Sequence, residues 1–204
     1  MKKILSMILF VLILGSILTT ALVAVDRITK DPIKRNKALR LQKGILSSLA
    51  IEYDEQDKNG IAEKFSDDGD VEEIEAPGED EKPVKFYRSK ASGDIAFEIK
   101  GMGIQGPIEA TIALSQDFEQ VRGLSIVSQK ETPGLGGRIE ETEFLDRFKG
   151  KMITTNGLDI LAPGKAAANN EVDGITGATL TCDALEILLN NQIKKYKVIF
   201  NESK

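Results

Sequence analysis

The sequence predicts an α+β fold, an antiparallel sheet with flanking helices, behind an N-terminal transmembrane helix. Residues 4–25 carry no charged side chain, and a run of about 20 apolar residues is what an α-helix needs to cross a bilayer. Apolar side chains alternate along residues 108–114, as they do in a half-buried strand. Along residues 185–193 they recur at the spacing of a helix with one buried face. Together these patterns indicate one membrane-anchored α+β domain.

The composition excludes several classes of protein. The 204 residues carry a net charge of −5, so the chain lacks the basic face that a nucleic-acid partner requires. Because the sequence contains no histidine, histidine-based acid–base pairs, catalytic triads and imidazole metal sites are excluded. The single cysteine, Cys182, cannot form an internal disulfide, and we interpret it as a small apolar residue at a helix start. We expect neither a catalytic side chain nor a metal site.

Residues 1–25 are predicted to form a single-pass anchor in the lipid bilayer. A cleaved signal peptide is the alternative, although its apolar region usually spans only about 7–15 residues. Lys2 and Lys3 precede the apolar run. Seven basic residues follow it, namely Arg27, Lys30, Lys34, Arg35, Lys37, Arg40 and Lys43. The positive-inside rule would therefore place the body of the protein in the cytoplasm.

Two further segments are predicted between the anchor and the domain. Residues 26–51 are expected to form an amphipathic connecting helix, whose basic face either meets anionic lipid headgroups or is simply solvated. Its apolar positions are Leu39, Leu41, Ile45, Leu46 and Leu49. Residues 52–83 are strongly acidic and poor in large apolar side chains, so we expect a solvated loop. Their acidic residues lack the spacing of a calcium-binding loop, and we assign no cation site there.

Residues 84–204 are predicted to form the domain itself. The first strand signals lie between Phe86 and Lys100. A hairpin is expected at residues 108–127, with its turn at 115–117. Residues 101–106 match the string GxGxxG, but they precede a strand rather than a helix. This context argues against a dinucleotide-binding site.

The C-terminal part of the domain is predicted to contain short elements and one longer helix. Residues 141–149 should form a short helix with Phe144, Leu145 and Phe148 turned inward. Short strands are expected at residues 152–153 and 158–161. The longer helix carries the apolar spacing at residues 185–193. Residues 196–200 then either continue that helix or form a terminal strand.

Two glycine-rich loops are the candidate binding segments. Proline and glycine in residues 131–137 predict a tight loop that exposes its backbone. Residues 172–182 place two glycines and three threonines in the turn before a helix N-terminus. Unpaired backbone N–H groups and the helix dipole favour a phosphate group at such a turn. The simpler interpretation is a threonine-capped helix start.

These two loops resemble two segments of the FMN-binding domain family. Residues 173–179, Asp-Gly-Ile-Thr-Gly-Ala-Thr, are similar to its flavinylation motif, in which an Asp is followed three residues on by Ser or Thr and then by Gly-Ala-Thr. Residues 131–137, Glu-Thr-Pro-Gly-Leu-Gly-Gly, resemble the other segment. The resemblance implies that Thr179 carries FMN through a phosphoester bond and that Asp173 positions its hydroxyl, through the magnesium ion of a flavin transferase. The implied cofactor-binding residues are Asp173, Gly174, Thr176, Gly177, Ala178, Thr179, Leu180 and Thr181, together with Glu131, Thr132, Pro133, Gly134, Leu135 and Gly136.

Within this family the chain most resembles the C-type subunits of the sodium-translocating NADH:quinone reductases, with the G-type subunits of the Rnf electron-transport complexes second. This resemblance implies a redox subunit that relays electrons beside other subunits of a complex in the bacterial inner membrane. It also implies a flavin transferase for maturation and a domain on the periplasmic face, against the positive-inside rule. Two alternatives stay open, a free-standing flavin carrier and a tethered binding or scaffold domain in which Thr179 only caps a helix.

Overall fold

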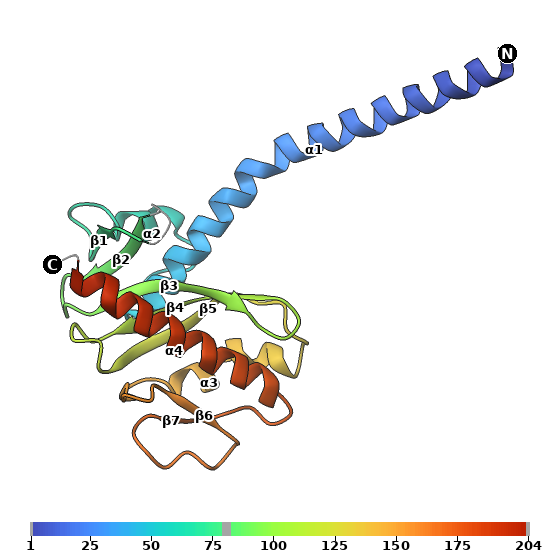
Figure 1. Cartoon of the computed structure of the whole chain (residues 1–204). Coiled ribbons are helices and arrows are strands. Elements are labelled where there is room, and N and C mark those ends of the chain that lie inside the picture. The colour runs from blue at the N-terminus through green and yellow to red at the C-terminus, as the bar shows by residue number, and fades with distance from the viewer. Residues whose placement is uncertain (1, 79–82, 203–204) are drawn as a thin grey trace. The chain divides into compact units, whose positions relative to one another are not determined.

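The computed structural model describes residues 2–78 and 83–202, and Figure 1 shows the order of its elements. The chain divides into two units, Met1–Leu39 and Arg40–Lys204. The described residues of the first unit are all helical. The second unit contains an antiparallel sheet with helices around it, so the predicted α+β fold is confirmed.

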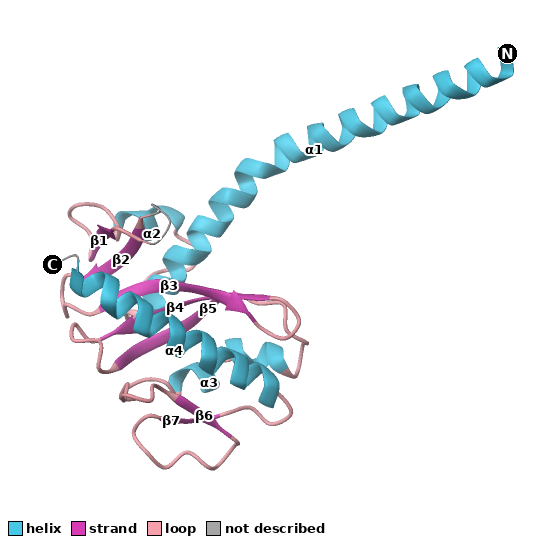
Figure 2. Ribbon diagram, in the orientation of Figure 1, coloured by secondary structure: helices cyan, strands magenta, loops and turns pink. Residues whose placement is uncertain are grey.

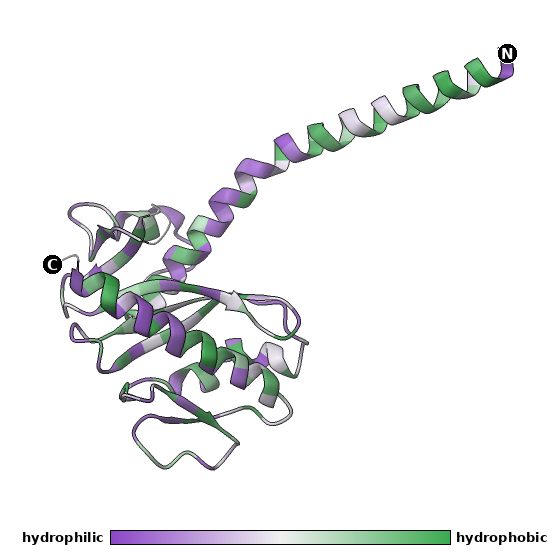
Figure 3. Ribbon diagram, viewed as in Figure 1, coloured by the Kyte–Doolittle hydropathy of each residue, from purple (hydrophilic) through white to green (hydrophobic). Residues whose placement is uncertain are grey.

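α1 (Lys2–Ser48) is one continuous helix that begins in the first unit and ends in the second. Its apolar part is exposed, and it is long and apolar enough to cross a membrane or to serve as a signal sequence. Figure 3 shows that apolar residues dominate its N-terminal half and that polar residues follow. The predicted boundary between the anchor and the connecting helix, at residue 25, lies within this continuous helix. Pro32 is the only proline or glycine between Gly15 and Gly44, and the helix continues through it.

A five-stranded antiparallel sheet forms the centre of the second unit, in the order β1-β2-β3-β4-β5. Its strands are β1 (Val71–Ala76), β2 (Val84–Ser89), β3 (Ile95–Met102), β4 (Pro107–Leu114) and β5 (Val121–Ser128). Each strand pairs with the strand that follows it in the chain. In the β3–β4 pair, for example, Ile99 lies opposite Ala110. The predicted hairpin is confirmed as β4 and β5. Short turns between neighbouring strands are therefore sufficient to build the whole sheet.

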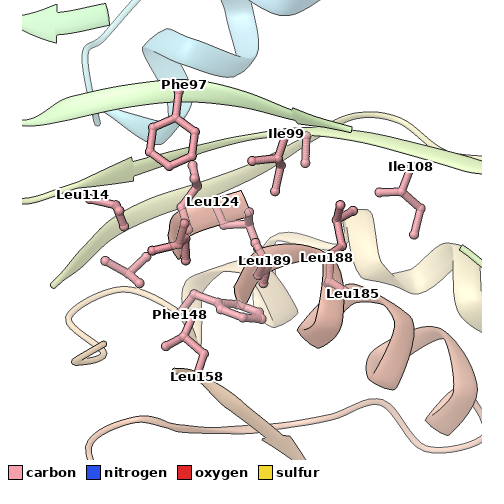
Figure 4. Packing of buried hydrophobic residues seen from close by; sticks show 14 of the residues in the cluster. Phe97, Ile99, Ile108, Leu114, Leu124, Phe148, Leu158, Leu185, Leu188 and Leu189 are labelled. Carbon is pink, nitrogen blue, oxygen red and sulfur yellow. The ribbon is translucent and has the colours of Figure 1, made fainter. Parts of the chain in front are cut away.

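α4 (Thr179–Glu202) lies across one face of this sheet, as Figure 2 shows. Figure 4 shows its side chains packed against those of β3 and β4 in the main core. The four apolar residues predicted for its inner face are all buried, namely Leu185, Leu188, Leu189 and Ile193. Helix and sheet approach closely, because a side chain at Gly101 of β3 would collide with Leu188. Residues 196–200 continue the helix rather than form a strand.

The last turns of α1 cover the other face of the sheet. Side chains alternate along β4, so Thr111 points away from α4. Gly44 of α1 lies against it, and a Cβ at that position would stand 3.0 Å from Thr111 Oγ1. In β5, Gly123 is so close to the Ser48 carbonyl that no side chain would fit. The apolar positions predicted here are buried at Ile45, Leu46 and Leu49 and half-buried at Leu39 and Leu41.

Short elements surround the sheet. They are α2 (Lys58–Glu63), the 3-10 helix η2 (Gly136–Glu140), α3 (Thr142–Asp146) and the parallel strands β6 (Asp159–Leu161) and β7 (Glu171–Asp173). α3 is the short helix predicted at residues 141–149, with Phe144 and Phe148 buried and Leu145 half-buried. Residues 158–161 include β6, whereas Met152 makes only an isolated bridge to Gln120.

The prediction of a loop over residues 52–83 is wrong where α2 and β1 lie within it. β1 is an edge strand, and it exposes Glu72, Glu73 and Glu75. Charged side chains on an edge strand discourage pairing with other chains, but they also hide the apolar alternation that would reveal a strand. Glu79, Asp80 and Glu81 of the predicted acidic loop lie outside the described residues.

Two polar side chains of α4 hold β6 against the helix. Asn190 accepts the N–H of Leu158 at 2.8 Å and donates to the carbonyl of the same residue at 2.8 Å. One turn earlier on α4, Glu186 accepts the N–H of Ile160 at 2.6 Å. These side chains pair with the backbone as a neighbouring strand would, and so they fix the part of the chain that leads into the second candidate loop.

We expect Asn190→Ala to lower the free energy of unfolding by about 1–3 kcal/mol, because it leaves both backbone groups of Leu158 without their partner. Asn191→Ala is the matched control, since Asn191 is exposed on the next position of the same helix. It should change the free energy by less than about 0.5 kcal/mol. Urea unfolding of the full chain in detergent, followed by circular dichroism, measures both. Equal stabilities of the two variants would contradict this account of β6.

Candidate functional site

The start of α4 presents unpaired backbone N–H groups to solvent. The first helical hydrogen bond runs from the Cys182 N–H to the Ala178 carbonyl at 2.9 Å. The N–H groups of residues 179–181 therefore have no partner within the helix. Gly177 has a φ of +80°, a left-handed conformation that glycine adopts without strain, and this bend leaves the hydroxyl-bearing Thr179 exposed. A 24-residue helix adds the positive end of its dipole at the same point.

The two candidate loops meet at a pocket of about 320 Å³. This volume lies near the lower end of the range of roughly 300–1,000 Å³ that is usual for small-molecule sites. Three segments line the pocket, with Ile104 and Gln105 from the β3–β4 turn, Glu131, Thr132, Leu135 and Gly136 from the first loop, and Gly177, Ala178, Thr179, Leu180 and Thr181 from the second. Loops more than 40 residues apart in the sequence are thus brought into one site.

Glycines let the two loops touch. A side chain at Gly136 would collide with Thr181 Oγ1, and it would stand 3.0 Å from Glu131 Oε2. At Gly177 a Cβ would lie 3.2 Å from Leu135 Cδ2. A side chain at Gly136 would displace Thr181, and one at Gly177 would be strained by the positive φ, so the pocket depends on both glycines.

A buried carboxylate forms the floor of the pocket. Glu131 is only 5% exposed, and its Oε2 accepts a hydrogen bond from Thr181 Oγ1 at 2.8 Å. Its Oε1 accepts the N–H groups of Ile104 at 2.8 Å and Gln105 at 3.0 Å. One side chain therefore contacts all three segments that line the pocket.

The rim of the pocket is apolar. Ile104, Leu135 and Leu180 are 49%, 48% and 66% exposed, and they come from the three different segments. Large apolar side chains that stay exposed around a pocket often mark a ligand or partner site. Together with the helix start, the site combines an apolar mouth with a position for a phosphate group. This is the division of polarity that a flavin mononucleotide has.

Five of the predicted site residues lie outside the lining of the pocket, namely Pro133, Gly134, Asp173, Gly174 and Thr176. The carboxylate of Asp173 accepts the N–H groups of Lys165 at 2.8 Å and Ala166 at 3.0 Å. These hydrogen bonds, chiefly that of Ala166, hold the pKa of the Asp173 carboxyl below its usual range. The contacts give Asp173 a role in ordering the preceding loop.

Gly174 and Cys182 pack behind the site. The N–H of Gly174 donates to the Leu161 carbonyl at 2.7 Å, and a Cβ at Gly174 would stand 2.7 Å from that oxygen. Cys182 is buried and accepts the Ile175 N–H at 3.4 Å. Desolvation raises the pKa of the Cys182 thiol, so the structure supports its interpretation as a packing residue.

Ile104 and Gln105 also line the pocket, although neither is among the predicted cofactor-binding residues. They lie in the glycine-rich stretch at residues 101–106, whose position before a strand argues against a dinucleotide site. The glycines of this stretch have a structural role instead. A side chain at Gly103 would collide with Glu131 Oε1, so this glycine lets the turn reach the buried carboxylate.

One segment of the chain is similar to a known family of domains. Residues 103–194 match the model of the FMN-binding domain. The C-type subunit of the Na(+)-translocating NADH-quinone reductase is 34% identical over 123 residues in Chlamydia muridarum and 32% identical over 116 residues in Yersinia pestis. These alignments cover 50% and 52% of this chain but only 39% and 44% of the relatives, so the chain spans less than half of each. The predicted resemblance is confirmed.

A second relative is covered more fully. The G-type subunit of the ion-translocating oxidoreductase complex of Methanosarcina acetivorans is 27% identical over 154 residues, which are 72% of this chain and 78% of that protein.

Two solved structures share the fold. The C-type subunit of the Na(+)-translocating NADH-quinone reductase from Parabacteroides distasonis superposes with a TM-score of 0.66, at 24% identity over 84% of this chain and 96% of that one. NqrC of Shewanella oneidensis gives 0.63 at 15% identity, over 83% and 98%.

The lowered pKa of Asp173 predicts how acid weakens this region. The carboxylate stabilises the folded state fully above its unfolded pKa of about 3.9, and that contribution is lost as the pH falls through the lower folded value. We therefore expect Asp173→Asn to be less stable than wild type at pH 7, with the difference shrinking towards pH 3. Asp68→Asn, at an exposed aspartate, is the control and should follow wild type at every pH. Urea midpoints across this range provide the measurement, and a constant difference between Asp173→Asn and wild type would contradict the assignment.

Proposed function

We propose that this chain is a membrane-anchored subunit that carries FMN, bound covalently to Thr179, and relays electrons within a sodium-translocating NADH:quinone oxidoreductase. The observation that carries the proposal is the pocket itself, in which the two motif loops meet beside an exposed threonine at a helix start. The FMN-binding domain match covers the same residues. The C-type relatives support the choice of complex.

The residues of the pocket fit an FMN group by chemistry, and the pocket has room for part of it. The N–H groups at the start of α4 would hold the phosphate next to the Thr179 hydroxyl. The apolar side chains of Ile104, Leu135 and Leu180 would contact the ring system. Gly136 and Gly177 add no Cβ between the loops, where Thr181 Oγ1 and Leu135 Cδ2 lie close to their backbones. When bound, FMN accepts two electrons and can pass them on singly, and the protein holds and tunes it.

Attachment requires help from another protein. A threonine hydroxyl is a weak nucleophile near neutral pH, and no histidine exists in this chain to act as its base. We therefore include a flavin transferase that uses a flavin dinucleotide as the donor. The Thr179 Oγ–phosphorus bond forms as the pyrophosphate bond of the donor breaks, the nucleoside monophosphate leaves, and the hydroxyl loses its proton. A role of Asp173 in that step, through the magnesium ion of the transferase, belongs to this proposal. In the structure this carboxylate accepts the N–H groups of Lys165 and Ala166.

A G-type subunit of an ion-translocating oxidoreductase complex is the second candidate. The Methanosarcina acetivorans relative favours it, because 78% of that protein is covered compared with 39% of the C-type protein from Chlamydia muridarum. Both candidates need the same flavin site. Purification of the chain from its native membrane, with mass spectrometry of the subunits that accompany it, distinguishes the two complexes. A flavin-bearing chain recovered without other subunits would indicate a free-standing carrier.

The first test of the proposal is the covalent bond. We expect the full chain, co-expressed with a flavin transferase, to gain the mass of one FMN group less water and to fluoresce in a denaturing gel. Thr179→Ala should lose both signals completely. Thr155→Ala is the control, because Thr155 is an exposed threonine outside both motif loops and the pocket, and it should keep both. Unmodified wild-type protein under these conditions would favour a scaffold in which Thr179 only caps α4. The measured mass also shows whether residues 1–25 are retained.

The second test concerns the side of the membrane on which the domain lies, which we propose to be the outer, periplasmic side. We expect Ala91→Cys, at an exposed position in the β2–β3 turn, to react with a membrane-impermeant maleimide in intact cells. The wild-type chain is the control, because its only cysteine, Cys182, is 3% exposed and should stay unlabelled. Labelling only after the membrane is broken would place the domain in the cytoplasm, as the basic residues after the anchor suggest.

A further inference from the structure

Glu131 is the only charged residue that is buried among the described residues, at 5% exposure. Carboxylates are seldom buried unless they are paired or hydrogen-bonded, because removal from water is costly. Its position therefore requires an explanation from its surroundings.

The hydrogen bonds of Glu131 join three separate segments. Oε1 accepts the N–H groups of Ile104 and Gln105 in the β3–β4 turn, at 2.8 and 3.0 Å. Oε2 accepts the Thr181 hydroxyl of α4 at 2.8 Å. The carboxyl group is the acceptor in all three hydrogen bonds. All three donors are neutral groups, so they hold the carboxylate in place without a compensating positive charge.

The space around the carboxylate is closely fitted. A side chain at Gly103 would collide with Oε1, and one at Gly136 would stand 3.0 Å from Oε2. These glycines come from the β3–β4 turn and from the loop that carries Glu131 itself. The backbone therefore approaches the carboxylate from two sides, and the carboxylate sits among the residues that line the pocket.

We infer that Glu131 is a positioning residue with two effects on the flavin site: its hydrogen bonds fix the three segments of the pocket relative to one another, and its negative charge lowers the reduction potential of the bound flavin. The second effect, on the reduction potential, rests on the proposed function. A negative charge beside the cofactor opposes the addition of electrons, and the opposition is stronger where the charge is buried than where water screens it. The first effect concerns the polypeptide alone.

Glu131→Gln separates the charge from the geometry. The amide oxygen can still accept the two backbone N–H groups, and the amide nitrogen can donate to Thr181 Oγ1, which also accepts hydrogen bonds. We expect this variant to carry covalent FMN and to have a more positive midpoint potential than wild type in a spectroelectrochemical titration of the full chain in detergent. Glu140→Gln is the matched control, because it removes the same charge from an exposed position on η2. Its potential should equal that of wild type.

The positioning effect is tested without any flavin. In the flavin-free Thr179→Ala background, we expect Glu131→Ala to speed hydrogen exchange at the amides of Ile104 and Gln105 about tenfold, the change expected from losing a hydrogen bond of ordinary strength. Glu131→Gln in the same background should keep the slow exchange. If the alanine variant does not fold, Glu131→Asp, whose carboxylate is one methylene shorter, should show the same loss of protection.

The outcomes separate this inference from the proposed function. Wild-type protein that never acquires FMN contradicts the proposed function, while the exchange measurements still decide the positioning effect. Flavinylated Glu131→Gln with the wild-type potential overturns the effect of charge. Unchanged exchange at Ile104 and Gln105 in both Glu131→Ala and Glu131→Asp overturns the positioning effect.

Discussion

The packing of α4 on the sheet is the constraint on which the rest of the site depends. Four apolar side chains of the helix are buried against β3 and β4, and the backbone of Gly101 lies so close to the Leu188 side chain that a Cβ there would collide with it. This contact determines where the first turn of the helix lies. Because the sheet also supports the β3–β4 turn, residues of that turn and of the helix start become neighbours. The position of Thr179 is therefore a consequence of core packing some two turns further along the helix.

The elements with a regular apolar pattern could be predicted from the sequence. Alternation along residues 108–114 and the helical spacing at Leu185 and beyond are local signals, and both elements have the structure that they predict. β1 could not be predicted in this way, because an edge strand has only one neighbour to bury its side chains and carries three exposed glutamates. The sequence pattern also did not reveal that α1 is a single helix. The change from apolar to basic residues near residue 26 changes the environment of the helix but does not end it.

Only residues within the two motif loops could be predicted as residues of the site. The resemblance identified both loops, and the structure brings them together. The contacts that join them are long-range, as between Glu131 and Thr181, which are 50 residues apart, and no local pattern reveals such a pair. For the same reason Ile104 and Gln105 were missed, and Asp173 was given a role beside Thr179 although its carboxylate contacts the preceding loop. Motifs located the residues, and tertiary contacts decided which of them face the pocket.

The openness of the pocket gives a physical reason for a covalent bond in the proposed function. A site of about 320 Å³ whose three largest rim residues are about half exposed or more can bury only part of a flavin. Burial of most of a ligand is what normally provides affinity, so contacts of this extent would release a freely diffusing cofactor. A tether at Thr179 removes that limit, because a bound group keeps a high local concentration however weak its other contacts are. The exposure that weakens binding also lets another redox centre approach. A carrier has to keep its flavin and also expose it to that centre, and one phosphoester bond serves both needs better than a deeper pocket does.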